Sequence, residues 1–211
     1  MLNYPPSRRW SPLLVLLLCA WNAAAEPVPD KEIYGTDDRV EVFQETNPFI
    51  AGLARSVCAL IHVENLQQNA DGTYTLLARD NTIGGNGDTE YFMCPDEAFA
   101  EQQWTAFCTG FVVGADLLAT AGHCIEYTGV GEYRAVFGWE MVDAVTPITV
   151  VPGERVYRVV EVVHSALNYA RDHAILRLDR VVTVPGAVPL AVRRAGKIAE
   201  GTRVGVIGHP M

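Results

Sequence analysis

The 211-residue sequence lacks the basic clusters that mark many binding proteins. It contains no run of lysine and arginine, and its formal net charge is −9. Nucleic acids and anionic membranes attract positive charge, so an acidic chain without a basic patch argues against both partners. Charged residues make up 19% of the chain and hydrophobic residues 49%, a balance typical of globular rather than disordered proteins.

Beyond residue 25 the chain has no apolar run long enough to span a membrane. The first 25 residues differ in kind, with the basic pair Arg8-Arg9, an apolar stretch over 13–20 and an A-x-A site at 23–25. This pattern predicts a secretory signal peptide, too short in its apolar part to serve as a mature anchor. Its removal takes away two arginines and no acid, which changes the formal net charge from −9 to −11. We therefore expect a secreted or periplasmic protein without a membrane anchor.

The usual metal-ligand spacings, C-x-x-C and H-x-x-x-H, are absent as well. Four cysteines follow the predicted signal peptide, and an even number in an exported chain predicts two disulfides. Zinc is an alternative interpretation because His123 and Cys124 are neighbours, but adjacent ligands suit a zinc site poorly, and we predict no metal site. The four cysteines are Cys58, Cys94, Cys108 and Cys124.

No long helical period is visible, whereas β-branched residues and turn signals recur along the chain. Hairpin connections between short strands predict an all-β fold with a closed antiparallel barrel. The glycine-rich run 82–88 lacks the Lys-Ser/Thr and the helix that a phosphate loop needs, so we expect a solvated loop there. Strands are expected at 58–64 and 73–79, joined by a turn at 69–72, and at 107–113, 117–120, 133–139, 157–164 and 173–178.

The end of the chain has a different composition. Residues 181–200 are richer in proline, glycine and arginine and predict a surface linker. Residues 201–211 read as one apolar strand, which has no core of its own. We therefore expect a chain truncated at the start of a second unit. The predicted order is a signal peptide at 1–25, an amino-terminal segment at 26–50 (a propeptide to about 33), a first barrel at 51–180, the linker, and the start of a second barrel.

Two residues are candidates for chemistry. His123 follows an apolar strand in a turn of small residues, which leaves room for its ring to face a cleft. Asp172 precedes an alternating strand, where a carboxylate needs a hydrogen-bonding partner such as an imidazole N–H. Local features alone favour a core histidine for His123, and a cap or a surface turn is the alternative for Asp172.

The stretch 108–124, CTGFVVGADLLATAGHC, resembles the trypsin/chymotrypsin-like serine peptidases. In that family a T-A-x-H-C stretch holds the catalytic histidine. Asp172 lies 49 residues after His123 in DHAILRL, which is similar to the family's D-x-A-L-L-x-L stretch. Residues 201–210 resemble the first strand of the family's second barrel, and 33–39, IYGTDDR, are similar to bacterial glutamyl-endopeptidase-like members.

This resemblance implies a double antiparallel β-barrel and an endopeptidase acting on polypeptide substrates, without a cofactor and as a monomer. His123 would be the base and Asp172 would orient it. The family's pairing implies a Cys108–Cys124 disulfide, which leaves Cys58 to pair with Cys94. It also implies an activating cleavage between Ala25 and Tyr34, and cleavage of substrates after acidic residues is one expectation.

The sequence departs from the family at the nucleophile. The only serines after residue 25 are Ser56 and Ser165, and neither lies in the family's G-[DN]-S-G-G context. The 211-residue chain is therefore predicted to be inactive alone, with the serine beyond its end. A non-catalytic member that acts as a binding or regulatory module is the alternative. Structural roles are expected for His164 and His209, and His173 is expected to point to the opposite face of its strand from Asp172.

Overall fold

The computed structural model describes residues 37–77, 98–100, 102 and 104–209. The chain forms two units, Met1–Arg39 and Val40–Met211, and the elements named below belong to the second. Within the described residues, no helix has the length and apolarity needed to cross a membrane. The predicted signal peptide, the loop at 82–88 and Cys94 lie outside the described residues.

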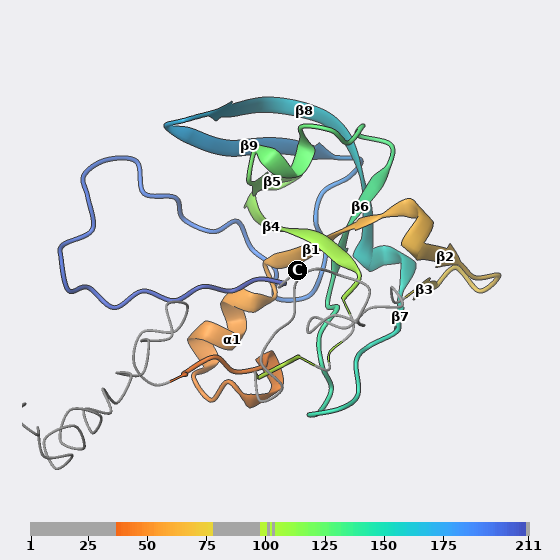
Figure 1. The fold of residues 1–211 in the computed structure, drawn as a ribbon. Helices are drawn as coiled ribbons and strands as arrows, with labels where there is room; N and C mark the ends of the chain where they lie inside the picture. Colours follow the sequence, from red (N-terminus) through yellow and green to blue (C-terminus); the bar gives the residue numbers. More distant parts are fainter. Residues whose placement is uncertain (1–36, 78–97, 101, 103, 210–211) are drawn as a thin grey trace, which may run out of the picture. The chain divides into compact units, whose positions relative to one another are not determined.

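Six strands close into an antiparallel barrel in the order β1–β4–β5–β9–β8–β6 (Figure 1). The predicted all-β fold class with a closed antiparallel barrel is confirmed, because strands dominate the described chain and its helices are short. The barrel strands are β1 (Val57–His62), β4 (Ala106–Gly114), β5 (Leu117–Thr120), β6 (Tyr133–Phe137), β8 (Val156–Asn168) and β9 (Arg171–Leu178). The helices are η2 (Val42–Gln44), α1 (Pro48–Ala54), η3 (Val63–Asn65), η4 (His123–Ile125) and η5 (Gly153–Arg155).

A second, three-stranded sheet has the order β2–β3–β7. Its strands are β2 (Leu66–Gln68), β3 (Tyr74–Leu76) and β7 (Val150–Val151). The predicted turn at 69–72 joins β2 to β3, so the expectation that it joins the strand at 58–64 was wrong. That strand is β1, which pairs with β4 and β6. It ends at His62 because the chain then turns into the short helix η3.

The barrel encloses a continuous apolar core. β1 is buried at five successive positions because both of its faces are covered by apolar clusters, Cys58 and Leu60 on one side and Ala59 and Ile61 on the other. β4 alternates between buried and more exposed residues. Leu60, Leu118 and Leu176 come from three different strands and are all fully buried. Burying a leucine side chain contributes roughly 1.5–3 kcal/mol. Closure also removes the unpaired edges of the sheet, so the barrel is a firm platform.

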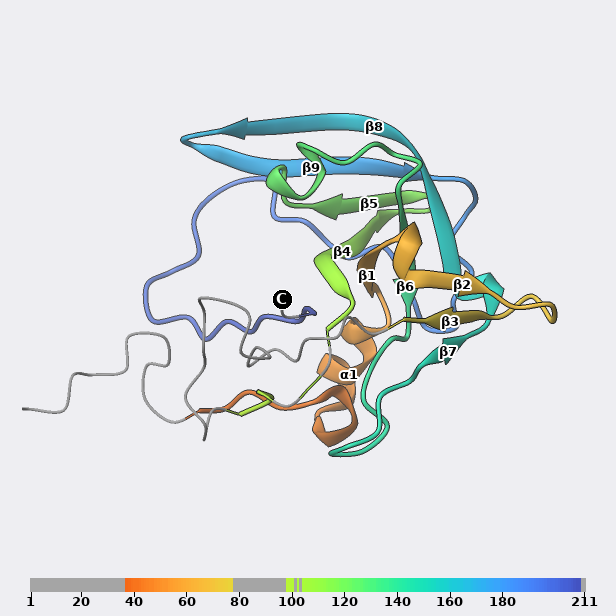
Figure 2. The ribbon, with the colours of Figure 1, turned by 45° about the vertical axis from the view of Figure 1, so that its right-hand side comes forward.

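β8 and β9 form a hairpin that runs beyond the rest of the barrel (Figures 1 and 2). β8 pairs with β6 only over Val156–Arg158, and the residues after Val159 pair with β9 alone. The burial of β8 changes at the same point, from mostly buried to mostly exposed. At the tip, the side-chain oxygen of Asn168 accepts a hydrogen bond from the Ala170 amide at 3.0 Å, which closes the turn.

Cys58 is a free, fully buried thiol on β1. It faces Gly110 on β4, where an added Cβ would lie only 3.2 Å from the Cys58 sulfur. Burial also raises the pKa of this thiol. Because Cys94 lies outside the described residues, the Cys58–Cys94 disulfide stays a prediction.

Residues 179–209 form no helix or strand. The expected strand at 201–211 is thus not formed over its described part, because a strand is held by pairing with a neighbour and this segment has no such pairing. Single hydrogen bonds tie the segment to the barrel instead. The Val182 and Leu190 amides donate to the carbonyl oxygens of Ala115 and Val112, each at 2.8 Å.

Candidate active site

His123 lies in a turn that leaves the barrel directly after β5. The Thr120 hydroxyl donates to the Thr109 carbonyl oxygen at 2.8 Å, which fixes the end of β5 against β4. The chain then makes one helical turn, η4, in which the Ile125 amide donates to the Gly122 carbonyl at 3.2 Å. The sequence reasoning did not single out Thr120, although a threonine ending a buried strand needs such a partner.

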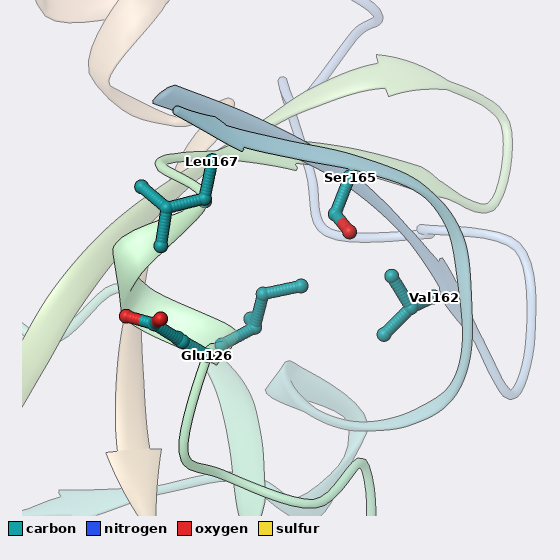
Figure 3. A pocket seen from close by; sticks show the side chains of 6 residues that line it. Glu126, Val162, Ser165 and Leu167 are labelled. Atoms are coloured by element: carbon teal, nitrogen blue, oxygen red, sulfur yellow. The ribbon is translucent and has the colours of Figure 1, made fainter. Parts of the chain in front are cut away.

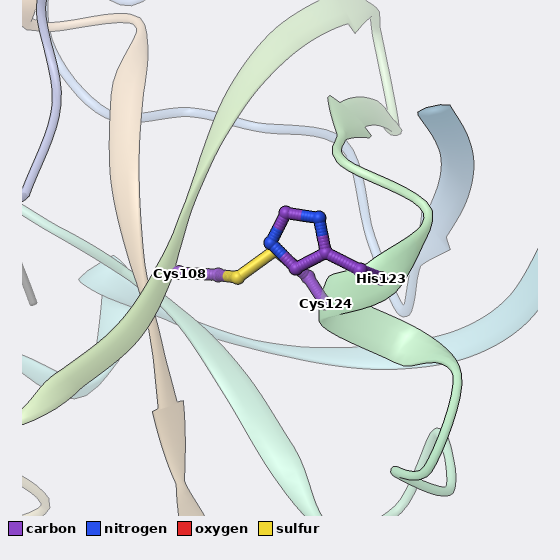
Figure 4. A group of neighbouring side chains, drawn as sticks. All are labelled: Cys108, His123 and Cys124. Atoms are coloured by element: carbon purple, nitrogen blue, oxygen red, sulfur yellow. A yellow bond between two sulfur atoms is a disulfide. The ribbon is translucent and has the colours of Figure 1, made fainter. Parts of the chain in front are cut away.

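A disulfide joins Cys108 on β4 to Cys124 in η4, with a Cα–Cα distance of 6.1 Å (Figure 4). It spans 16 residues, and both half-cystines are buried in the barrel core. The turn that carries His123 is therefore covalently held to the barrel wall.

Gly122 brings the same turn against the β8–β9 hairpin. A Cβ added at Gly122 would lie 2.9 Å from the Ala166 carbonyl oxygen and 3.2 Å from Oδ1 of Asp172. The sequence indicated small residues that leave room for the His123 ring, and in the structure Gly122 also permits the close approach of the hairpin. The consequence is that β9 lies next to His123.

Asp172, at the start of β9, holds His123 with both carboxylate oxygens. Oδ2 lies 2.7 Å from Nδ1 of the ring, and Oδ1 accepts a hydrogen bond from the His123 backbone N–H at 2.9 Å. The two side chains are half-exposed, at 54% and 45%. The structure thus brings together the two candidate residues that stand 49 positions apart in the sequence.

The pKa of the Asp172 carboxyl is lowered from its ordinary value. The hydrogen bond with the His123 side chain is the largest cause, and the backbone amides of His123 and Gly122 add to it. Because a carboxylate only accepts hydrogen bonds, Nδ1 must carry the proton in this pair. In the neutral ring the free lone pair is then on Nε2, which is the arrangement a general base requires.

Nε2 lies 3.7 Å from the Cys124 sulfur, so Cys108, His123 and Cys124 form a compact group (Figure 4). Three such side chains could hold zinc if the cysteines were thiolates. Both sulfurs are consumed in the disulfide, however, so this donor set does not fit a metal ion.

The remaining histidines singled out in the sequence lie elsewhere. His164 and His173 are exposed on the β8–β9 hairpin and lie against each other, whereas Asp172 bonds to His123. His209 stacks on Trp139 with ring centroids 5.3 Å apart, and its backbone amide donates to the Thr109 hydroxyl at 2.8 Å.

Neither candidate serine is bonded to His123. Ser56 is fully buried, and its hydroxyl oxygen accepts a hydrogen bond from the Val188 amide at 2.9 Å. Ser165 lies on β8 and faces an open hollow of about 340 Å³ (Figure 3). Sequence reasoning missed this hollow because its walls come from two distant segments. It is lined by Gly122, Ile125, Glu126, Val162, Ser165 and Leu167.

Fold and geometry together define a β-barrel protein with a disulfide-anchored, hydrogen-bonded His–Asp pair. The sequence pattern of the trypsin family matches residues 94–210, which is more than half of the chain, and the chain belongs to that family. A comparison with curated proteins finds no match. The family membership supports a serine peptidase in general and polypeptides as the class of substrate.

Proposed function

We propose that this chain supplies the base and the orienting acid of a secreted serine endopeptidase. In this proposal His123 is the base, Asp172 orients it, and the nucleophilic serine belongs to a part of the protein beyond residue 211. The serine oxygen bonds to the scissile carbonyl carbon while its proton passes to Nε2 of His123. That proton then goes to the departing amine as the C–N bond breaks, and water hydrolyses the acyl-enzyme by the same route.

The observation that carries the proposal is the two-point contact between Asp172 and His123. Oδ2 at 2.7 Å from Nδ1 favours the tautomer with a free lone pair on Nε2, and Oδ1 fixes the backbone of the same residue. A carboxylate in this position also stabilises the imidazolium that forms when the base takes a proton. The half-exposed ring is accessible to a substrate.

Ser56 and Ser165, the two serines that follow residue 25, lack the surroundings of a nucleophile. Ser56 is buried and already bonded to the Val188 amide, and Ser165 stands in a paired strand opposite Ala174. Neither sits on a sharp turn with converging backbone amides, which a nucleophile and its oxyanion hole need. A serine beyond residue 211 therefore fits the base better than either one.

The same proposal includes the domain order and the cellular location. Residues 1–25 would be a signal peptide, residues 51–180 the first barrel, and residues 181–211 a linker and the start of a second barrel. The Cys108–Cys124 disulfide supports export, because disulfides persist mainly outside the reducing cytosol. Cleavage after acidic residues and an activating cut between residues 25 and 34 belong to this proposal as well.

The test is to express the gene with all of its reading frame beyond codon 211 and to label the product with a fluorophosphonate probe. We expect one labelled serine within a G-x-S-G-G context. Asp172→Asn should lower kcat by about 10⁴-fold, because the ring tautomer is no longer fixed, and His123→Ala should abolish labelling. Ser165→Ala is the matched control and should label like the wild type.

A reading frame that stops soon after codon 211 without such a stretch would contradict the proposal. It would favour the alternative, a non-catalytic barrel that acts as a binding or regulatory module. Labelling of Ser165 itself would overturn the assignment of the nucleophile.

A further inference from the structure

The outer face of the β8–β9 hairpin carries two histidines side by side. His173 is paired with Ala166 across the hairpin, and His164 lies two residues before Ala166 on the same strand. Diagonal neighbours of this kind are within reach of each other on one face of an antiparallel pair. Their ring centroids are 5.4 Å apart, with an angle of 32° between the ring planes, and both residues are exposed.

This separation suits two rings that share one metal ion. Imidazole nitrogens bind zinc at about 2.0–2.1 Å, and at a tetrahedral angle the two ring centroids then lie roughly 5 Å apart. The observed 5.4 Å is close to that value, so small side-chain rotations bring both rings onto an ion. The backbone between them is held by the β8–β9 ladder, which reduces the entropy lost on binding.

Charged side chains of both signs lie on the same face. Arg171 lies two residues before His173 along β9, whereas Arg177, four residues after it, is committed to two carboxylates: it donates to Glu161 at 2.8 Å and to Asp116 at 3.0 Å. Two carboxylates and one guanidinium leave this group with a negative charge. The rings of His164 and His173 have no hydrogen bond to a carboxylate among the described residues, so their nitrogens stay available as ligands.

We propose that His164 and His173 form a two-histidine site for a divalent transition-metal ion, with water completing the coordination. Neutral imidazole suits zinc, copper and nickel, whereas magnesium and calcium prefer oxygen ligands. The ion would bridge β8 and β9 close to the tip of their hairpin. Because His173 follows Asp172 directly, the bound ion would also stiffen the strand that positions the carboxylate.

The test is calorimetric titration of the full 211-residue chain with Zn²⁺ at about pH 7.5, where protons compete little with metal for imidazole. We expect one ion per chain with a dissociation constant in the micromolar range, of order 1–100 μM, as few protein ligands and exposed geometry dictate. His164→Ala and His173→Ala should each weaken binding at least about tenfold. Cu²⁺ should bind more tightly than Zn²⁺, and Mg²⁺ should give no heat of binding.

His123→Ala is the matched control, since it removes a histidine beside the disulfide, and it should leave zinc binding unchanged. Circular dichroism of each variant checks that the barrel is intact, which is expected because both ligands are exposed. Absence of zinc binding overturns the proposal, as does binding that survives either single substitution at full strength. Loss in the His123 variant alone would move the site to the catalytic pair. None of these outcomes depends on peptidase activity.

Discussion

The barrel and the segment that follows it, residues 179–209, differ in the hydrogen bonding of their backbone and in the burial of their apolar side chains. In the barrel each strand pairs with two neighbours, and its large side chains are buried. The following segment makes isolated hydrogen bonds and exposes six large aliphatic residues. These are Val181, Val188, Val192, Ile198, Val204 and Val206.

The two candidate site residues lie on the barrel side of this contrast, His123 in η4 and Asp172 on β9. The apolar side chains of the segment are divided, because Val182 and Val184 pack against the barrel core whereas the six named above are exposed. Substitutions in the barrel and in residues 179–209 are expected to differ in their effect on the free energy of unfolding.

The largest effect is expected inside the barrel. Leu176→Ala removes a fully buried side chain at the centre of β9 and should lower the free energy of unfolding by about 2–5 kcal/mol. Val206→Ala is the matched control in the other region, where the side chain is 96% exposed, and should change it by less than about 0.5 kcal/mol. Urea unfolding followed by circular dichroism measures both. Equal effects would mean that the segment is as much a part of the core as β9.

The second-largest effect on stability is expected from removal of the Cys108–Cys124 disulfide. Replacing Cys108 and Cys124 together by alanine opens a loop of 16 residues and should cost roughly 3 kcal/mol of stability through the entropy of the unfolded chain. Thermal unfolding with and without reductant measures this cost. The double variant should no longer respond to the reductant; a response that persists would point to a second disulfide.

A smaller effect is expected where the two regions meet. Ser56→Ala removes the acceptor of the Val188 amide and should destabilise the protein by about 1 kcal/mol. Hydrogen exchange at the Val188 amide should become faster, while exchange within β1 stays unchanged. Ser165→Ala, whose hydroxyl faces the open hollow, should alter neither. Unchanged exchange in the Ser56 variant would contradict the proposed tie.

The last expected effect is a pH response of residues near 209. Burial lowers the pKa of His209 to about 4, below the ordinary 6.5, so the docked segment prefers the neutral ring. Docking is therefore strongest above pH 6.5 and weakens as the pH falls toward 4. The fluorescence of Trp139, which stacks on His209, should report the release. His209→Gln should remove this response, and Trp139→Phe should remove the signal.

The alternation of apolar and polar residues was sufficient to predict the positions of the longer barrel strands. The alternating pattern of β4 and the turn before β5 come from local side-chain preference, and the structure has both elements close to their predicted places. β2, β3 and β7 have two or three residues each, too few for a pattern to emerge. The hairpin was consequently assigned to the wrong strand.

Contacts between residues distant in the sequence were harder to predict from local patterns. The interior position of Cys58 depends on the register of β1 against β4, which counting cysteines cannot supply. The contact between His123 and Asp172 was anticipated only through resemblance to a family, because nothing local links residues 49 positions apart. The strand expected at 201–211 had a suitable composition but no partner strand, and pairing decides whether such a segment becomes a strand.

The two oxygens of Asp172 also explain why this position calls for aspartate. One oxygen receives the main-chain N–H of His123 and the other its ring N–H, so the side chain must offer two acceptors at short reach. Asparagine has one acceptor and would turn an NH₂ group toward one of the two donors, and glutamate would move both oxygens by the length of a methylene. The residue type at this position thus follows from counting donors, independently of any reaction.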